Sequence, residues 1–286
     1  MVTRWEKIAF ASTAALNGSD AANTNDTRNI WVINADGSQA KALTQLTALN
    51  IDCFDPAWSP DGSKIVFGST RALDGTDTNT TNAVENIWVM NADGSQATPL
   101  TKITAANGDS FSAAWSPDGS KILFVSERAL DLSDAANTNS TDNIWVMNAD
   151  GSNPTALTQV TAASAHSFGP AWSPDGSKIA FGSQRALDGS NAANTNNLEN
   201  TWVMNADGSH ATALTQLTAA SAGSFGPFLW SPDGSKVLFA SRRALDGSDA
   251  SNPTFNIWTV NPDGSHATAL TQLTTSGADS TQPAQP

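Results

Sequence analysis

Short apolar runs, rich in β-branched and aromatic residues, recur along the chain and are separated by clusters of turn-forming residues. This pattern is typical of β-strands joined by tight turns. In one representative stretch we predict strands at residues 167–172, 178–183, 201–204 and 211–215. The first two are joined by Ser173–Gly176, whose Ser-Pro-Asp-Gly sequence suits a type I turn ending in a left-handed Gly.

The same four-run pattern returns at a nearly constant spacing. A phrase containing Asn, Trp and Val starts at Asn29, Asn86, Asn143, Asn200 and Asn256, which lie 57, 57, 57 and 56 residues apart. A second phrase, Trp-Ser-Pro-Asp-Gly-Ser-Lys, occurs at residues 58–64, 115–121, 172–178 and 230–236. A fixed period containing four short strands and their turns predicts the blades of a β-propeller.

We therefore predict an all-β fold, a five-bladed β-propeller of four-stranded blades that forms a single domain. The opening segment, Glu6–Phe10, matches a second strand and lacks a first strand before it, whereas the tail from Asp279 matches the start of a first strand. We expect the tail to complete the first blade and to close the ring, since closure removes exposed sheet edges. The predicted blades are residues 1–47 with 279–286, 53–104, 110–161, 167–218 and 224–274.

The blade phrases resemble those of the TolB-type, WD-repeat-like propeller family. The segment Pro170–Gly176, followed by Ile179, Phe181, Trp202 and Met204, matches the signature of that family. Four copies are complete and one is split between the termini. The resemblance implies a propeller used as a binding scaffold in the periplasm or outside the cell, although the family's named member has six blades and a further domain. The close likeness of the copies is also typical of recent amplification or consensus design.

Composition narrows the classes of partner. The net charge is −13 with 14% charged residues, so the chain lacks the basic surface that nucleic acid or an anionic membrane requires. No apolar run approaches the roughly 20 residues of a membrane span, and no signal-peptide core follows Met1. Cys53 is the single cysteine, so an internal disulfide is excluded and the compartment stays undetermined. We expect a monomer without membrane insertion.

The longest predicted loops follow the second strand of each blade and share one sequence, Arg-Ala-Leu-Asp followed by small and acidic residues. Because strand direction alternates, these loops and the blade-to-blade connections should emerge on one face, where binding residues often lie. The candidate ligand-binding residues on this face are Arg71, Asp74, Asp77, Arg128, Asp131, Asp134, Arg185, Asp188, Arg243, Asp246 and Asp249.

Three interpretations of these loops are open. In the first, Arg and Asp pair with each other and the Asp, Asn and Thr side chains close local turns. In the second, which we favour less, Asp74, Asp77, Asp131 and Asp134 bind calcium, although their spacing is not that of a known calcium loop. In the third, Arg and Asp form a repeated pocket between blades for a sugar or peptide. We expect no cofactor.

Catalytic residues are not evident in the sequence. The three histidines occupy unlike positions, and none stands in a recognisable nucleophile–base set. The ten Trp residues recur at fixed positions and are expected in the core. We therefore expect a non-catalytic scaffold that binds a protein or peptide on its long-loop face. The alternatives are a lectin-like propeller with several glycan pockets or a polysaccharide lyase or hydrolase.

Overall fold

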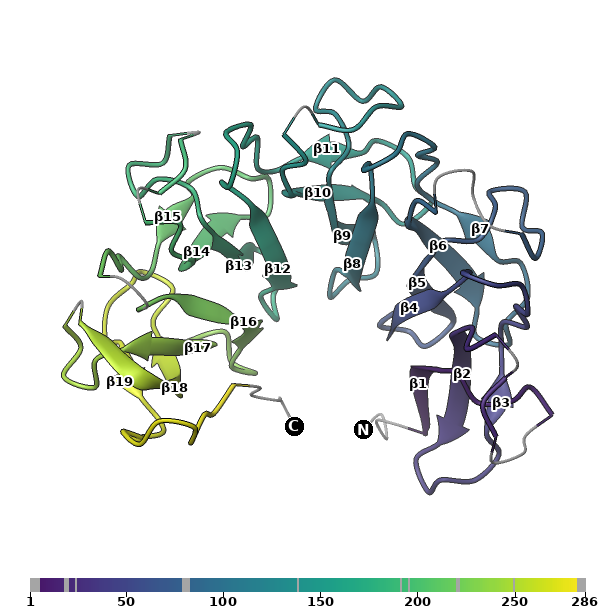
Figure 1. Cartoon of the computed structure of the whole chain (residues 1–286), viewed down its shortest axis with the longest axis horizontal. Helices are drawn as coiled ribbons and strands as arrows, with labels where there is room; N and C mark the ends of the chain where they lie inside the picture. Colours follow the sequence, from purple (N-terminus) through teal and green to yellow (C-terminus); the bar gives the residue numbers. More distant parts are fainter. Residues whose placement is uncertain are drawn as a thin grey trace. The chain divides into compact units, whose positions relative to one another are not determined.

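The computed structural model describes residues 6–17, 21–23, 25–78, 83–137, 139–190, 192–194, 196–219, 222–248 and 250–281 (Figure 1). This part of the chain contains strands β1 to β19 and no helix, so no helix within it could cross a membrane. The strands form five antiparallel sheets, in agreement with the all-β prediction. Two compact units divide the chain: Met1–Asn137 with Met147–Pro154, and Thr138–Val146 with Thr155–Pro286.

The first unit contains two sheets and a hairpin. Its first sheet has three strands in the order β1-β2-β3, and its second has four in the order β4-β5-β6-β7. The β8–β9 hairpin belongs to the third sheet, whose order is β11-β10-β9-β8. The bounds are β1 (Lys7–Ser12), β2 (Asn29–Asn34), β3 (Lys41–Ala42), β4 (Cys53–Trp58), β5 (Lys64–Ser69), β6 (Asn86–Asn91), β7 (Thr98–Pro99), β8 (Ser110–Trp115) and β9 (Lys121–Ser126).

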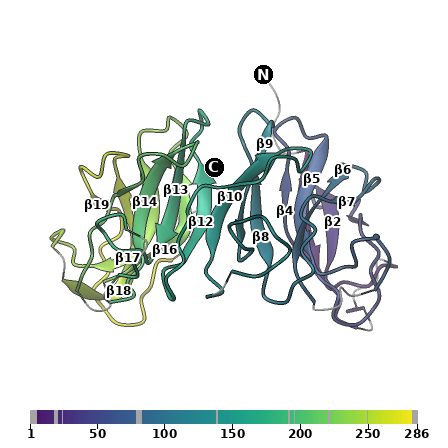
Figure 2. The same cartoon turned by 90° about the horizontal axis from the view of Figure 1, so that it is seen from above.

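The second unit contains the fourth and fifth sheets, each with its strands in chain order. Strand β16 of the fifth sheet lies against β12, β13 and β14 of the fourth (Figures 1 and 2). The remaining strands are β10 (Asn143–Asn148), β11 (Thr155–Ala156), β12 (Ser167–Trp172), β13 (Lys178–Ser183), β14 (Asn200–Asn205), β15 (Thr212–Ala213), β16 (Ser224–Trp230), β17 (Val237–Arg243), β18 (Ser251–Val260) and β19 (Thr268–Ala269).

The predicted tight turns are present. In the fourth sheet, Gly176 has a φ of 72° and donates its N–H to the carbonyl of Ser173 at 2.9 Å. Asp175 accepts hydrogen bonds from the hydroxyl of Ser173 at 2.6 Å and from the N–H of Ser177 at 3.0 Å. Local side-chain hydrogen bonds therefore specify this turn, which explains why its sequence is repeated.

Aromatic pairs fill the cores of the sheets. Phe181 of β13 lies opposite Trp202 of β14, and Phe67 of β5 lies opposite Trp88 of β6, with all four side chains buried. The predicted burial of the third-strand Trp residues is thus confirmed. Among the Trp residues that end the first strands, Trp230 is buried, but Trp58, Trp115 and Trp172 are only partly buried. Full burial was the wrong expectation for these three, because the end of the strand beside an exposed turn leaves part of each side chain uncovered, whereas Trp230 packs in a buried cluster with Phe228 and Trp258.

A buried Asn fastens the start of each third strand to the fourth strand. The side-chain oxygen of Asn86 accepts hydrogen bonds from the hydroxyl of Thr101 and the N–H of Ile103, both at 2.9 Å. Its amide nitrogen donates to the Ile103 carbonyl at 3.0 Å. The equivalent residues Asn29, Asn143, Asn200 and Asn256 are also fully buried.

The tail follows the expected path as far as the structure describes it. The N–H of Ser280 donates to the carbonyl of Phe255 at 3.0 Å, as Ser224 does to Glu199 at 2.8 Å. The tail thus enters the position of a first strand, although residues 279–281 are not themselves in a strand. Residues 282–286, on which closure of the ring depends, lie outside the described residues, so closure remains a prediction.

Candidate functional site

The arginines of the long loops are held by the loops that carry them. The guanidinium of Arg71 lies 4.9 Å from the centre of the Trp88 ring and donates a hydrogen bond to the Gly75 carbonyl. Arg185 lies 4.8 Å from the ring of Trp202. Arg128 donates a hydrogen bond to the Leu132 carbonyl at 3.1 Å. Arg243 donates to the Gly247 carbonyl and lies over the ring of Trp258, as Arg71 does with Gly75 and Trp88. The recurring Arg therefore fixes the loop on the aromatic core.

The first acidic residue of each loop closes a local turn. Asp74 accepts a hydrogen bond from the N–H of Thr76 at 2.9 Å, and this bond lowers the pKa of the Asp74 carboxyl. Asp131, Asp188 and Asp246 accept the equivalent bond from the residue two positions later. These are the Asx-type turns of the first interpretation, which is confirmed in this respect.

The second acidic residue reaches the preceding sheet. The carboxylate of Asp77 accepts hydrogen bonds from the N–H and hydroxyl of Thr47, at 3.0 and 2.6 Å, and from the N–H of Ala48 at 3.2 Å. Asp134 binds the N–H of Thr104 at 2.8 Å and also its hydroxyl. These carboxylates tie each loop to the end of the neighbouring fourth strand. Asp249 lies outside the described residues.

The expected Arg–Asp pairing is not what the loops show. Neither Arg71 nor Arg185 has a carboxylate within ion-pair distance in the described ranges, where the sole such contact joins His166 and Asp142 at 3.1 Å. The expectation was wrong for these two arginines because a backbone carbonyl and an indole ring satisfy the guanidinium instead. Within the same ranges, no three His, Cys, Asp or Glu side chains gather as metal ligands would.

A different group of residues forms the most exposed aromatic cluster, which we call the Phe225 patch: Phe225, Phe255 and Arg242. The rings of Phe225 and Phe255 meet edge to face with their centres 5.1 Å apart. The guanidinium of Arg242 lies 4.2 Å from the centre of the Phe255 ring. Phe225 is 41% exposed, and the Nε of Arg242 is buried without a hydrogen-bond partner in the described structure.

The Phe225 patch is where the fifth repeat departs from the others. Phe255 stands where earlier copies have Arg28, Glu85, Asp142 and Glu199, and Arg242 stands where they have Thr70, Glu127 and Gln184. Comparing the copies position by position would have indicated this site. The repeated residues, from which the candidates were predicted, do not include Arg242 and Phe255, because these two residues are differences among the repeats.

The patch lies beside an irregular part of β16, the first strand of the fifth sheet. In the four complete sheets, the pairing of the first and second strands shifts after the Phe at the second position of the first strand. Asp55 and Ser112, which follow Phe54 and Phe111, have positive φ values of 44° and 53°. Bulges of this kind redirect side chains and are frequent at functional sites. The Phe side chains directly before these bulges are not buried: Phe54, Phe111 and Phe168 are partly exposed, and Phe225 is exposed.

Glu199, which is buried, and Glu85, which is partly buried, directly precede the third strands of their sheets. Burial raises the pKa of Glu199 to about 9, although the N–H of Gly226 partly offsets this effect. Burial, together with Asp109 and Asp55, raises the pKa of Glu85 to about 8. Both side chains are therefore predominantly protonated at neutral pH. Neither Glu85 nor Glu199 belongs to a motif that is repeated in every copy, so no signal in the repeats marks them.

His166 and Cys53 have structural surroundings. The Nδ1 atom of His166 lies 3.2 Å from the N–H of Asp142, a position that the Asp109 carboxylate occupies in the preceding repeat. Cys53 is fully buried, burial raises its pKa to about 11, and its sulfur lies 3.5 Å from the Ser69 hydroxyl. Cys53 is thus a packing residue of the core.

The repeated antiparallel sheets define a TolB-like β-propeller, and the count of five sheets agrees with the five predicted blades. A putative TolB from Agrobacterium tumefaciens superposes with a TM-score of 0.58 at 19% identity, covering 94% of this chain and 82% of that one. An oligogalacturonate lyase in complex with manganese gives a TM-score of 0.60 at 17% identity, covering 94% and 62% of the two chains. At these identities the similarity establishes the fold alone.

Sequence comparison finds similarity to curated proteins, one of them from Bacillus subtilis. The uncharacterized peptidase YuxL of Bacillus subtilis is 28% identical over 134 residues, which are 47% of this chain and 17% of that protein. The match thus spans less than a fifth of the relative's length. No family model matches the chain.

These comparisons correct the expectation that the chain is not an enzyme. That expectation was wrong because similar proteins carry the names of a peptidase and a lyase. The lack of a recognisable nucleophile–base set in the sequence is therefore no ground for excluding an enzymatic role.

Proposed function

We propose that this chain recognises a protein or peptide segment, as partner or as substrate, through the Phe225 patch. The observation that carries the proposal is a pair of aromatic rings, the exposed Phe225 and the partly buried Phe255, with a guanidinium stacked on Phe255, in a chain whose net charge is −13. Aromatic residues and Arg dominate the binding energy of protein interfaces.

The surroundings of the patch support a specific type of ligand. Arg242 and Arg243 are the single pair of adjacent cationic residues in the sequence. A peptide carrying an apolar or aromatic side chain next to a carboxylate would bury Phe225 and pair with Arg242. The stacked guanidinium is positioned before binding, so little side-chain entropy is lost on association.

The location of the patch agrees with the predicted long-loop face. Phe225 lies at the start of β16, Arg242 near the end of β17 and Phe255 within β18, whose preceding loop connects it to β17. The name of the YuxL relative supports a peptide ligand. The periplasmic or extracellular location implied by the resemblance to TolB remains a prediction.

The test is selection from a phage-displayed library of random peptides, followed by titration of the enriched peptides using fluorescence anisotropy. We expect enriched sequences to combine apolar and acidic residues. Phe225→Ser and Arg242→Gln should each weaken binding by more than about tenfold, the effect of losing a hot spot of roughly 2 kcal/mol. Phe111→Ser, at the equivalent position of the third sheet, is the matched control and should bind as the wild type does. No enrichment, or equal weakening by all three variants, would refute the proposal.

A further inference from the structure

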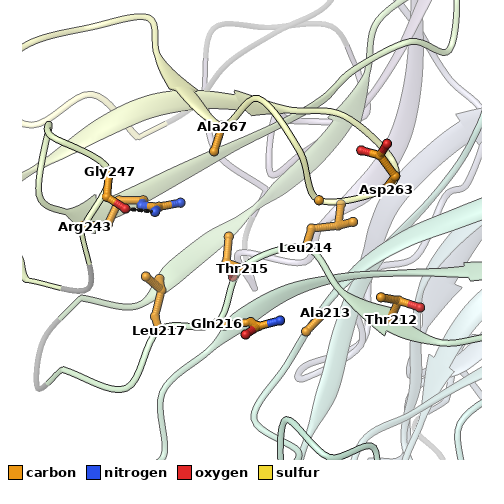
Figure 3. A pocket seen from close by; sticks show the side chains of 11 residues that line it. Thr212, Ala213, Leu214, Thr215, Gln216, Leu217, Arg243, Gly247, Asp263 and Ala267 are labelled. Atoms are coloured by element: carbon orange, nitrogen blue, oxygen red, sulfur yellow. Dashed lines mark hydrogen bonds between the residues drawn. The ribbon is translucent and has the colours of Figure 1, made fainter.

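A pocket of about 410 Å³ lies between the fourth and fifth sheets, and Phe225, Arg242 and Phe255 are not among the residues that line it. Residues 212–217 form one wall, and Arg243, Gly247, Asp263, Gly264 and Ala267 form the other. Arg243 and Gly247 lie at one side of the pocket and Asp263 at the other, with Leu214 and Gln216 between them (Figure 3). The volume falls within the range of about 300–1,000 Å³ found for small-molecule sites.

At this pocket, the last turn of the fifth sheet lies farther from the fourth sheet than the equivalent turns lie from their preceding sheets. A Cβ atom placed on Gly264 would lie 3.6 Å from the carbonyl oxygen of Leu214. The same distance is 2.8 Å for Gly94 and Leu43, 3.1 Å for Gly151 and Leu100, and 3.0 Å for Gly208 and Leu157. At the three other junctions, the equivalent glycine thus lies closer to the facing leucine carbonyl.

An additional residue in the sequence accompanies the wider junction. Trp172 and Trp230 are 58 residues apart, whereas Trp115 and Trp172 are 57 apart, and β16 has seven residues where β12 has six. The additional side chain is Phe228, which is 2% exposed. Its ring lies against the backbone of Gly169 and Gly182 of the fourth sheet. The ring of Phe228 therefore packs between the fourth and fifth sheets, although it does not line the pocket itself.

The chemistry of the walls indicates the class of ligand. Gln216 is exposed and supplies both a donor and an acceptor, and Asp263 supplies a carboxylate whose second oxygen accepts none of the hydrogen bonds found in its turn. Leu214, Leu217 and Ala267 add apolar surface. Hydroxyl groups both donate and accept hydrogen bonds, so a polyol with an apolar ring face matches these walls. The Asp263 carboxylate and the Arg243 guanidinium lie at opposite sides of the pocket, so their charges favour a neutral ligand over an ion of either sign.

We propose that this pocket binds one neutral sugar residue, as a site separate from the Phe225 patch. Gln216 and Asp263 hydrogen-bond the sugar hydroxyls, and Leu214 and Ala267 contact the C–H face of the ring. One pocket per chain is assigned, in contrast to the several equivalent pockets of a lectin-like propeller.

The test uses methyl glycosides of glucose, galactose, mannose and N-acetylglucosamine, observed by saturation-transfer difference NMR and titrated against the intact chain. At least one glycoside should bind at one site per chain. Gln216→Ala and Asp263→Asn should each weaken binding about three- to tenfold, as expected for a lost hydrogen bond. The matched controls Gln159→Ala and Asp207→Asn change the equivalent residues at the tight junction between the third and fourth sheets, and should leave binding unchanged.

Three results would overturn the proposal: no transfer to any glycoside, several equivalent sites per chain, or equal weakening by the control variants. Thermal melting of every variant checks that it is folded, so that lost binding is not mistaken for lost structure. Because the Phe225→Ser variant should keep its sugar binding, failure of the peptide proposal and failure of this one are distinguishable.

Discussion

The carboxylate of Glu199 occupies space that a side chain at Gly182 would need. A Cβ atom on Gly182 would lie 2.7 Å from Oε1 of Glu199, and also within 2.8 Å of the rings of Phe168 and Phe228. The same pairing occurs in the second sheet, where the carboxylate of Glu85 lies over Gly68. In the third and fifth sheets, the position equivalent to Gly182 is occupied by Val125 and Ala240. The residue at the position equivalent to Glu199 in these sheets is Asp142 or Phe255, not Glu. Gly and Glu at these two positions are thus a matched pair.

Substitution of Gly182 should therefore destabilise the fold. We expect Gly182→Ala to reduce the free energy of unfolding by about 1–3 kcal/mol, because the new methyl group meets three side chains at distances that require movement. Gly68→Ala is the matched comparison and should cost less, since its nearest contacts are all with the one side chain of Glu85. Urea denaturation measures both. Equal costs would show that the Phe rings do not contribute.

The buried carboxyl groups predict how stability depends on pH. The pKa values of Glu85 and Glu199 rise from an ordinary 4.5 to about 8 and about 9 in the folded state. Between these values the folded chain binds protons that the unfolded chain has released, so stability falls as pH rises. Their contribution is fully present below about pH 4.5 and is lost as pH passes through 8 and 9.

Removing one of the ionisable groups should remove part of this dependence. We expect Glu199→Gln to be more stable than the wild type at pH 9 and to show a smaller loss of stability between pH 5 and pH 9. Glu6→Gln, which alters an exposed carboxyl group, should follow the wild-type curve. Denaturant unfolding at several pH values measures the dependence, and identical curves for wild type and Glu199→Gln would contradict the assignment.

The sheets were predictable from sequence because their signals are local. Turn residues such as Asp175 form hydrogen bonds with neighbours two positions away, and the Trp202 phrase marks the core strand directly. The arginine loops were predicted as binding residues because they repeat. Their repetition has a structural cause, since each Arg binds its own loop and the third-strand Trp below it.

The candidate site was not predictable in the same way, because it depends on contacts between distant positions. Phe225, Arg242 and Phe255 meet across three strands, and the space for Glu199 exists only because residue 182 is Gly. Comparison of the repeats marks Arg242 and Phe255 as departures from the other copies, but the sequence does not show that the two side chains meet. The pocket beside Gly264 likewise accompanies a single additional residue, Phe228, in a neighbouring strand.

The buried Asn at the start of each third strand should be a major source of stability. We expect Asn86→Ala to cost about 2–5 kcal/mol, because it leaves the Thr101 hydroxyl and both backbone groups of Ile103 without their partner in the core. Asn91→Ala, at the other end of β6, is the control, since its side chain bonds exposed groups such as Ser95. That variant should lose less than about 1 kcal/mol. Similar losses in the two variants would refute the role assigned to Asn86.

Calcium binding by the long loops can be decided by melting the protein in excess EDTA and in millimolar calcium. We expect coincident curves, because the carboxylate of Asp77 already accepts hydrogen bonds from Thr47 and Ala48, whose N–H and O–H groups would compete with a cation. Asp134 is held in the same way by Thr104. Binding at a hundredfold excess over Kd would stabilise the fold by about 2.7 kcal/mol and raise the melting temperature by at least about 2–4 °C. A rise of that size, abolished by Asp77→Asn, would show that calcium displaces these hydrogen bonds and that the loops are metal sites.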